Sequence, residues 1–359
     1  MIGQSRGSSR GRRRLAGVAG AAALALLAAC GGTTGNETSG GGGGGGGGGE
    51  RPLIYGVYAT PLEEPWDGAI HSALQSAVED GKIEYKHVDN LSTSDAMERA
   101  LRDIATNEKP AAIMGDAFAA EEAVRKVAKD YPDMPFAFGS GEKPASPNMS
   151  VFDNWLQDPA YLAGMLSGGL TKSNVIGVVG AMPIPEVNRI VNAFVLGVKE
   201  TNPKATVKVS FINTFFDPAA AKQAAQAQVS AGADVLFAER DGVISAAKEA
   251  NLPVVGMMVD QKDEAPKNVV TSLIWHVRPT VDQVVEQATG KPEAVDLGKY
   301  SFMKEGGSEL APINTDVVGG VPQDLVKQVE QKEQAIKDGS FTTPIDESAP
   351  KGSIDVSKQ

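Results

Sequence analysis

The sequence predicts an α/β protein made of two doubly wound, Rossmann-like lobes with a ligand cleft between them. From Leu53 onward, short apolar segments typical of strands alternate with amphipathic segments typical of helices. Such alternation predicts parallel sheets covered by helices. This alternation of predicted strands and helices runs to about residue 155 and begins again at Val175, which indicates two lobes. Ligands of open α/β sheets bind at the carboxyl ends of the strands, so the two lobes predict a cleft where those ends face each other.

The first series predicts four strands and four helices. Strands are expected at 53–59, 83–89, 111–116 and 135–140, and helices at 66–81, 95–108, 119–132 and 159–171. The second series predicts strands at 175–181, 207–215, 234–239 and 253–258, with helices at 185–203, 218–232 and 242–251. Asp217 and Pro218 fit the N-cap and first helical positions, and Gly232 fits the position after a helix end.

One more strand and helix follow, at 268–277 and 279–290, and we expect this pair to return to the first lobe. A late helix is expected at 322–339. The predicted lobes are therefore discontinuous. The N-terminal lobe takes residues 52–155 plus 262–295, and the C-terminal lobe takes 156–261 plus 296–359.

The N-terminus predicts export and a lipid anchor. Four arginines between positions 10 and 14 precede an apolar run of small residues, and Leu27-Ala28-Ala29-Cys30 resembles a bacterial lipobox. We expect residues 1–29 to be a lipoprotein signal peptide and Cys30 to be lipidated at the extracytoplasmic face of the cell membrane. The alternative is an ordinary signal peptide with an incidental cysteine. Residues 30–51 are rich in glycine and predict a flexible tether.

Composition excludes several functions. A formal net charge of −11 argues against nucleic acid as a partner. Three histidines and one cysteine leave no disulfide framework and no cysteine-based zinc site, and we expect no cofactor. The first strand-to-helix turn lacks the glycine fingerprint of a dinucleotide site, and no G-x-S-x-G elbow occurs. We therefore expect no enzyme; a nucleoside-cleaving enzyme is kept as the least favoured alternative.

The predicted strand ends collect aromatic and carboxylate side chains, and all three tryptophans fall at such ends or loops. Aromatic planes beside carboxylates suit a flat heterocycle that donates and accepts hydrogen bonds, because stacking on a ring contributes about 1–3 kcal/mol per base. The candidate ligand-binding residues are Trp66, Asp67, Asp116, Phe118, Asn154, Trp155, Phe216, Glu239, Met258 and Trp275.

Each candidate has an alternative role in packing. The tryptophans could fill a helix start, a hinge or a core, Asp67 and Asp116 could cap helices, and Glu239 could pair with Arg240. Phe215 and Phe216 alternate on the predicted strand, so only one of them should face the cleft.

Several segments together resemble the basic membrane protein (BMP) family of PnrA-like substrate-binding lipoproteins. They include "VAKDYPDMPFAF", "YLAGMLSGGLTKSNVIGVVGAMPIPEVNRIVNAFVLGVKETNP", "FFDPAAAKQAA", "GADVLFAE" and "VDQKDEAP…VVTS", and they span about residues 53–311. The resemblance implies a type I periplasmic-binding-protein fold, a monomer, and a partnership with the permease and ATPase of an ABC importer.

The resemblance also implies roles for individual residues. Where purine-nucleoside members carry Phe-Asn after the first strand, this sequence has Trp66-Asp67; Asp116 matches a ligand-binding position, and Phe216 rather than Phe215 matches the second stacking ring. The Asp and Lys that hold ribose in nucleoside binders become Met258 and Trp275. Burying ribose hydroxyls there would cost roughly 1–3 kcal/mol each.

The sequence therefore predicts an extracytoplasmic lipoprotein that captures a purine base, adenine-like, or a related nucleoside, and delivers it to a permease. Two alternatives stay open: a surface lipoprotein that senses its ligand, and a binder of another flat heterocycle or a sugar.

Overall fold

The computed structural model describes residues 51–118 and 120–358, which fall within one compact unit. Two sheets, each flanked by helices, make up these residues and confirm the predicted α/β class with two parallel-stranded lobes. The signal peptide, Cys30 and the tether up to residue 50 lie outside the described residues, so those expectations stay predictions.

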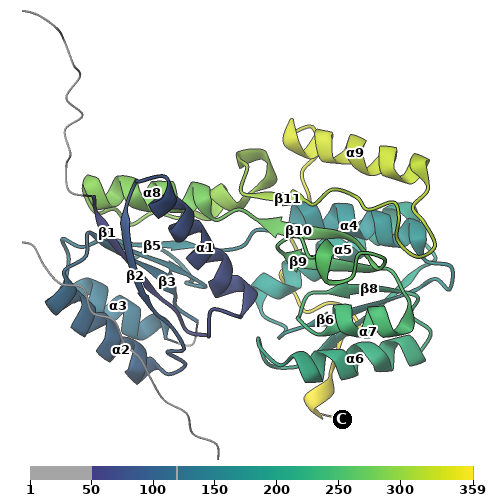
Figure 1. Ribbon diagram of the computed structural model, residues 1–359, viewed down its shortest axis with the longest axis horizontal. Helices are drawn as coiled ribbons and strands as arrows, with labels where there is room; N and C mark the ends of the chain where they lie inside the picture. The colour runs from purple at the N-terminus through teal and green to yellow at the C-terminus, as the bar shows by residue number, and fades with distance from the viewer. Residues whose placement is uncertain (1–50, 119, 359) are drawn as a thin grey trace, which may run out of the picture. The chain divides into compact units, whose positions relative to one another are not determined.

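The first lobe is built on a five-stranded parallel sheet. Its strands are β1 (Leu53–Val57), β2 (Glu84–Val88), β3 (Ala112–Asp116), β4 (Phe136–Gly139) and β5 (Met149–Phe152). The helices around it are α1 (Pro65–Glu79), α2 (Ser94–Asp103), α3 (Glu121–Asp130) and α8 (Arg278–Thr289), with a π-helical turn, η1 (Ile104–Glu108), after α2. The order β2-β1-β3-β4-β5 places the switch in winding direction between β1 and β3. Helices α1 and α8 pack together, as do α2 and α3 (Figure 1).

The second lobe repeats this order in a larger sheet. Its strands are β6 (Val175–Gly180), β7 (Thr206–Phe211), β8 (Val235–Ala238), β9 (Val254–Met258), β10 (Val269–Trp275), β11 (Ser308–Leu310) and β12 (Ile354–Asp355). Its helices are α4 (Gln157–Leu170), α5 (Pro185–Thr201), α6 (Pro218–Ser230), α7 (Val243–Ala250) and α9 (Gln323–Lys337), with 3-10 turns η2 (Lys262–Glu264), η3 (Gly298–Ser301), η4 (Met303–Glu305) and η5 (Val356–Lys358). The strand order is β11-β10-β9-β8-β6-β7-β12, and only β11 runs antiparallel to its neighbour. Its switch point lies between β6 and β8.

One predicted lobe assignment is wrong. The strand expected to return to the first lobe, β10, pairs in parallel with β9 and therefore belongs to the second sheet. The physical reason is its pattern of burial: nearly every residue of β10 is buried, as a strand inside a covered sheet requires. Only the following helix, α8, packs on the first lobe, where it contacts α1 and β3.

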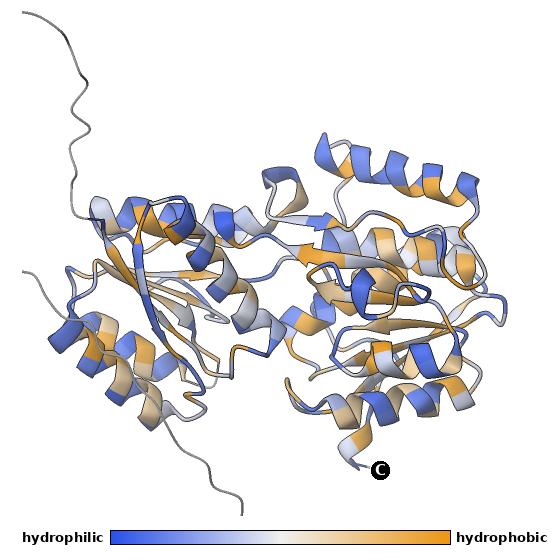
Figure 2. Cartoon of the chain, viewed as in Figure 1, coloured by the Kyte–Doolittle hydropathy of each residue, from blue (hydrophilic) through white to orange (hydrophobic). Residues whose placement is uncertain are grey.

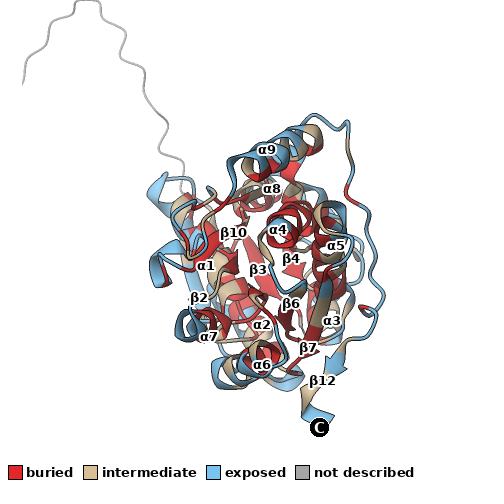
Figure 3. Ribbon diagram, turned by 90° about the vertical axis from the view of Figure 1, so that its right-hand side faces the viewer, coloured by how far each residue is buried: buried red, intermediate tan, exposed pale blue. Residues whose placement is uncertain are grey.

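The chain crosses between the lobes three times. It leaves the first sheet after β5, returns between β10 and α8, and leaves again through the segment 295–297. This last segment runs beside β5, where the Leu297 N–H donates to the Val151 carbonyl oxygen at 2.8 Å. Figures 2 and 3 show most strands as an apolar, buried layer of the fold, whereas the edge strand β2 is largely polar and exposed.

Helices α4 and α5 pack with their backbones in contact. Gly164 of α4 lies against the backbone of Phe194, and Gly197 of α5 lies against the backbone of Tyr161. Any side chain at either glycine would clash with a carbonyl oxygen, so the close crossing depends on both. The crossing fixes α5, whose first turn reaches the site described below.

We expect Gly164→Ala to lower the free energy of unfolding by about 1–3 kcal/mol, the usual cost of overpacking. Gly169→Ala is the matched control in the same helix. Its added carbon would meet only the side chain of Leu325, which can move, and alanine improves helix propensity by up to about 1 kcal/mol. Urea denaturation followed by circular dichroism measures both variants. Equal losses in the two would contradict the prediction.

Candidate functional site

The carboxyl ends at the two switch points form the walls of one small pocket, which we call the interlobe pocket. The first lobe contributes Thr60, Glu64, Trp66, Asp116, Phe118 and Ser140, and the second contributes Glu186 and Phe215. The space at its centre is about 20 Å³, enough for about one water molecule. The site is therefore a set of converging side chains with the lobes in contact.

Trp66 is held in a group of three aromatic rings. Its ring lies parallel to Phe152 with centroids 6.0 Å apart, and Trp275 packs against it at 5.0 Å with a tilt of 42°. The Trp275 Nε1–H donates to Ser301 at 2.9 Å. The buried Nε1 of Trp66 has no hydrogen-bond partner among the described residues. Trp66 therefore packs against two aromatic rings and lines the pocket, and its indole N–H has no partner among the described residues.

The second aromatic pair comes from both lobes. Phe118, after β3, meets Phe215, after β7, edge to face with centroids 4.7 Å apart. Phe215 lines the pocket, whereas Phe216 is 41% exposed. The resemblance matched Phe216 to the stacking ring, whereas Phe215 lines this pocket, so the role expected for Phe216 stays a prediction. The predicted strand ran to residue 215, but β7 ends at Phe211 and the backbone turns at Asn213, whose φ is 58°, so strand alternation does not apply.

Two aspartates of the first lobe are buried in this region: Asp116 lines the pocket, and Asp67 lies behind Thr60, which lines it. Asp67 accepts hydrogen bonds from the Thr60 amide at 2.9 Å and the Thr60 hydroxyl at 2.6 Å, while its Oδ1 has no partner. Asp116 accepts from the Phe118 amide at 2.8 Å. Burial raises the pKa of Asp67 to about 7 and that of Asp116 well above its ordinary value, with mutual repulsion adding to the second shift. Both groups hold a proton more readily than ordinary aspartates.

Glu64 and Arg240 join the two lobes, in a set that we call the Arg240 junction. Arg240 Nη2 lies 2.9 Å from Glu239 Oε1, and Nη1 lies 3.3 Å from Glu64 Oε1. Glu64 also caps α1, accepting from the Trp66 amide at 2.9 Å and the Asp67 amide at 3.1 Å. The α1 cap is thus Glu64, not Asp67. Glu239 and Arg240 do not line the pocket; Arg240 joins Glu239 to Glu64, which does.

Sequence reasoning missed Glu64 and Glu186 as site residues. Both are acids at a helix start beside a proline, and in sequence each has the pattern of an ordinary first-turn acid or cap. The one available signal was position, because each acid follows the strand that comes first in its lobe, β1 or β6, at the switch point of the sheet. Glu186 is buried and lines the pocket.

The remaining candidates lie outside the pocket. Asn154 is fully buried at the first crossing, and Trp155 packs beneath the guanidinium of Arg189 at 4.1 Å and against Phe302. Trp155 therefore fills the hinge region, the alternative considered for it. Met258 and Trp275 line an open groove of about 610 Å³ beside the pocket, so they flank the site without closing it.

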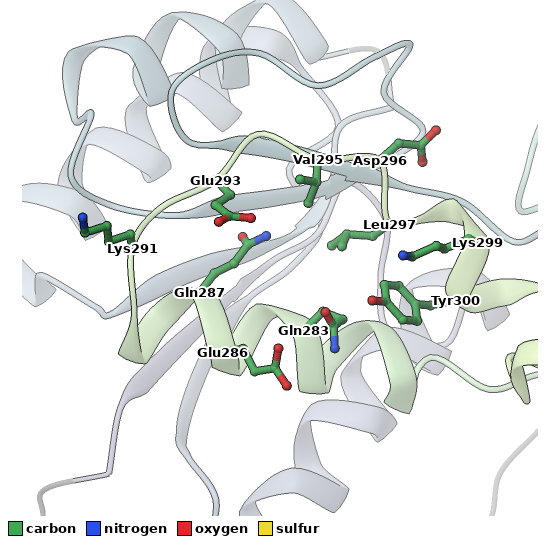
Figure 4. A pocket seen from close by; sticks show the side chains of 10 residues that line it. All are labelled: Gln283, Glu286, Gln287, Lys291, Glu293, Val295, Asp296, Leu297, Lys299 and Tyr300. Atoms are coloured by element: carbon green, nitrogen blue, oxygen red, sulfur yellow. The ribbon is translucent and has the colours of Figure 1, made fainter.

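A separate hollow of about 400 Å³ lies between α8 and the segment 291–300 (Figure 4). Its rim carries the exposed side chains of Glu286, Lys291 and Glu293, and no candidate residue lines it. It contributes nothing to the interlobe pocket.

The described residues contain no group of three or more His, Cys, Asp or Glu side chains that could hold a metal ion. Within those same ranges, no helix has the length and apolar character needed to cross a membrane.

Comparisons with known proteins agree with this geometry. A family profile described as ABC transporter substrate-binding protein PnrA-like (Bmp) matches residues 59–344. A purine-binding protein of Brucella abortus is 30% identical over 272 residues, which cover 74% of this chain and 75% of that protein.

A Haloferax volcanii protein named as an ABC transporter glucose-binding protein is 34% identical over 213 residues. That match covers 58% of this chain, and the chain spans about half, 54%, of the Haloferax protein.

Among solved structures, a solute-binding protein of an ABC transporter system from Aeropyrum pernix K1 shares the fold, with a TM-score of 0.68 at 20% identity. It covers 82% of this chain and 94% of its own. The family resemblance seen in the sequence is therefore confirmed over most of the chain: it belongs to the PnrA-like (Bmp) family of ABC transporter substrate-binding proteins.

Proposed function

We propose that this chain is the binding lipoprotein of an ABC importer that captures a purine base, most simply adenine, in the interlobe pocket. The observation that carries the proposal is the convergence of Trp66, Phe118 and Phe215 with the buried carboxyl groups of Asp116 and Glu186. Rings of this kind stack on a flat heterocycle, and the carboxyl groups can read the donors and acceptors along its edges. The purine-binding name of the Brucella relative supports the same ligand class.

We infer that a ligand with a pentose is excluded, because of the side chains that line the groove beside the pocket. Met258 and Trp275 stand there, 1% and 4% exposed, where the resemblance places an Asp and a Lys in nucleoside binders. Neither replacement can pair with a ribose hydroxyl, since Trp275 already donates its N–H to Ser301. A free base leaves no hydroxyl groups to bury, whereas a nucleoside does.

Capture requires the lobes to part and close again. A volume of about 20 Å³ is far below the roughly 300–1,000 Å³ of ligand pockets, so the Glu64–Arg240 contact must open to admit a base. Closure on the ligand then presents a form that a permease and its ATPase recognise. A sensing role, in which the closed form reports to another protein, would use the same motion. In either role we propose that the chain binds its ligand without catalysing a reaction.

Isothermal titration calorimetry tests the ligand. We expect adenine to bind at least about tenfold more tightly than adenosine, because one or more buried hydroxyl groups without partners cost roughly 1–3 kcal/mol each. Glucose is the third ligand to be titrated, because the Haloferax relative is named as a glucose-binding protein and makes a sugar the second candidate ligand. Equal affinities for adenine and adenosine would end the pentose exclusion. Tight glucose binding with no adenine binding would replace the proposed ligand.

Two neighbouring phenylalanines give a matched pair of variants. Phe215→Ala should weaken adenine binding by about 1–3 kcal/mol, roughly 5-fold to 150-fold, because a stacking ring is lost. Phe216→Ala is the control, and its affinity should stay within about twofold of the wild type since the side chain is exposed. The sequence-based expectation assigns the stacking ring to Phe216. A larger loss of adenine affinity in Phe216→Ala than in Phe215→Ala would favour that expectation.

The lipid anchor is tested in the native host. We expect Cys30→Ala to abolish labelling by a radioactive fatty acid and to move the protein from the membrane fraction to the soluble fraction, because Cys30 is the chain's only cysteine. Adenine affinity of the purified body should not change. Membrane retention of Cys30→Ala at the wild-type level would refute lipidation at this residue.

A further inference from the structure

Glu186 differs from the other acids at the interlobe pocket in having no assigned partner. It is the second residue of α5 and is 7% exposed. Its Oε1 has no hydrogen-bond partner among the described residues. By contrast, Glu64 and Glu239 hold Arg240. Buried polar atoms in native proteins are nearly always paired, so the unpaired oxygen at a pocket wall indicates a group that meets the ligand.

The charges that face Glu186 come from three elements. They are Asp153 after β5, Arg189 on α5, and Glu239 and Arg240 after β8. Both cations are already engaged. Arg189 pairs with Asp153 at 2.6 Å and with Glu347 at 3.3 Å, and Arg240 belongs to the junction. Neither forms an ion pair with Glu186 among the described residues, although both lower its pKa and Arg189 Nε has no hydrogen-bond partner there.

Glu186 therefore holds its proton more readily than an ordinary glutamate when the lobes are together. Burial, with repulsion from Asp153 and Glu239, raises the pKa of Glu186 to about 8, against the attraction of the two arginines. The positive end of α5 favours the ionised form by only about 0.3–1 kcal/mol, which is less than the cost of burying an unpaired carboxylate. A neutral carboxyl group has one O–H donor as well as acceptor capacity.

We propose that Glu186 binds the ligand as a carboxylic acid, donating a hydrogen bond to an unprotonated ring nitrogen of the purine, so that capture is linked to a proton. The inference rests on the proposed function and names the chemistry of one contact in the same pocket. A carboxylic acid suits adenine because each polar edge of the free base sets a donor beside an acceptor. The proton comes from bulk solvent, and no covalent bond changes.

The sign of the linkage follows from the donor role. A ligand that accepts the Glu186 proton binds only the protonated form, so the proton affinity of Glu186 is higher in the complex than in the free protein. Affinity must then fall as pH rises between the pKa of the free protein and that of the complex. With the lobes parted the ordinary value is about 4.3, and with the lobes together it is about 8. Whichever of these two values is the pKa of the free protein, the affinity for the ligand falls at least about tenfold between pH 6 and pH 9.

Calorimetry with adenine across this pH range, in buffers of different ionisation enthalpy, tests the inference. The wild type should lose at least about tenfold in affinity from pH 6 to pH 9 and take up about half a proton or more on binding at pH 8. Glu186→Gln keeps a donor beside an acceptor but cannot titrate. At pH 6 it should bind at least about one third as tightly as the wild type, and between pH 6 and pH 9 it should lose less affinity and take up fewer protons than the wild type does.

Asp158→Asn is the matched control. Asp158 is a buried carboxyl group of α4 with a raised pKa, caused chiefly by burial, and it does not line the pocket. This variant should keep the wild-type pH profile. Thermal melts without ligand confirm that both variants fold.

The outcomes separate the two proposals. If the wild type binds no purine at any pH, the proposed function fails and the inference falls with it. If adenine binds but Glu186→Gln shows the same fall and the same proton uptake as the wild type, only the inference is overturned. A folded Glu186→Gln protein that no longer binds adenine at pH 6 also overturns it, because an amide donor would then fail to replace the acid.

Discussion

The buried guanidinium of Arg240 is the group on which the rest of the site depends. Removing one partner from a buried ion pair typically costs about 3–5 kcal/mol, so Arg240 needs both Glu239 and Glu64. Glu64 can reach it only by standing at the start of α1, where it also accepts the first amides of the helix. That cap fixes where α1 begins, and the beginning of α1 places Trp66 at the pocket. One charge thus positions side chains in both lobes.

The same junction determines the state of the remaining acids. The two buried arginines near the pocket, Arg189 and Arg240, are each held by carboxylates from two different segments. Asp67, Asp116 and Glu186 are left without a cation in a site of low polarity. Burial makes each of them hold a proton more readily than an ordinary carboxyl group. The pocket therefore combines aromatic rings with acids that can donate, which is a different surface from the carboxylates that the sequence suggests.

Most of the fold was predictable because strand and helix periods differ and several helix starts are signalled by a capping side chain or a proline. The site was predictable only where position in the sheet decides the outcome, as for Trp66 and Asp116 at the carboxyl ends of β1 and β3. The directions of Phe215 and Phe216 were not predictable from strand alternation, because β7 ends at Phe211 and the backbone turns at Asn213. The partners of Trp155 and Glu64, which are Arg189 and Arg240, are distant in sequence, and no local pattern announces them.

The junction also gives a physical reason for selectivity. When the lobes part, Arg240 keeps Glu239 but loses Glu64, which lies on the other lobe. In the proposed capture, a flat ligand in the interlobe pocket would let Glu64 and Arg240 pair again on closure, and the lost interaction would be regained. A bulkier guest holds the lobes apart and leaves Glu64 and Arg240 separated in a partly dry cleft. Separating this buried ion pair is costly. A thick ligand should therefore bind weakly even if its outline and polar groups fit the rings and acids of the pocket.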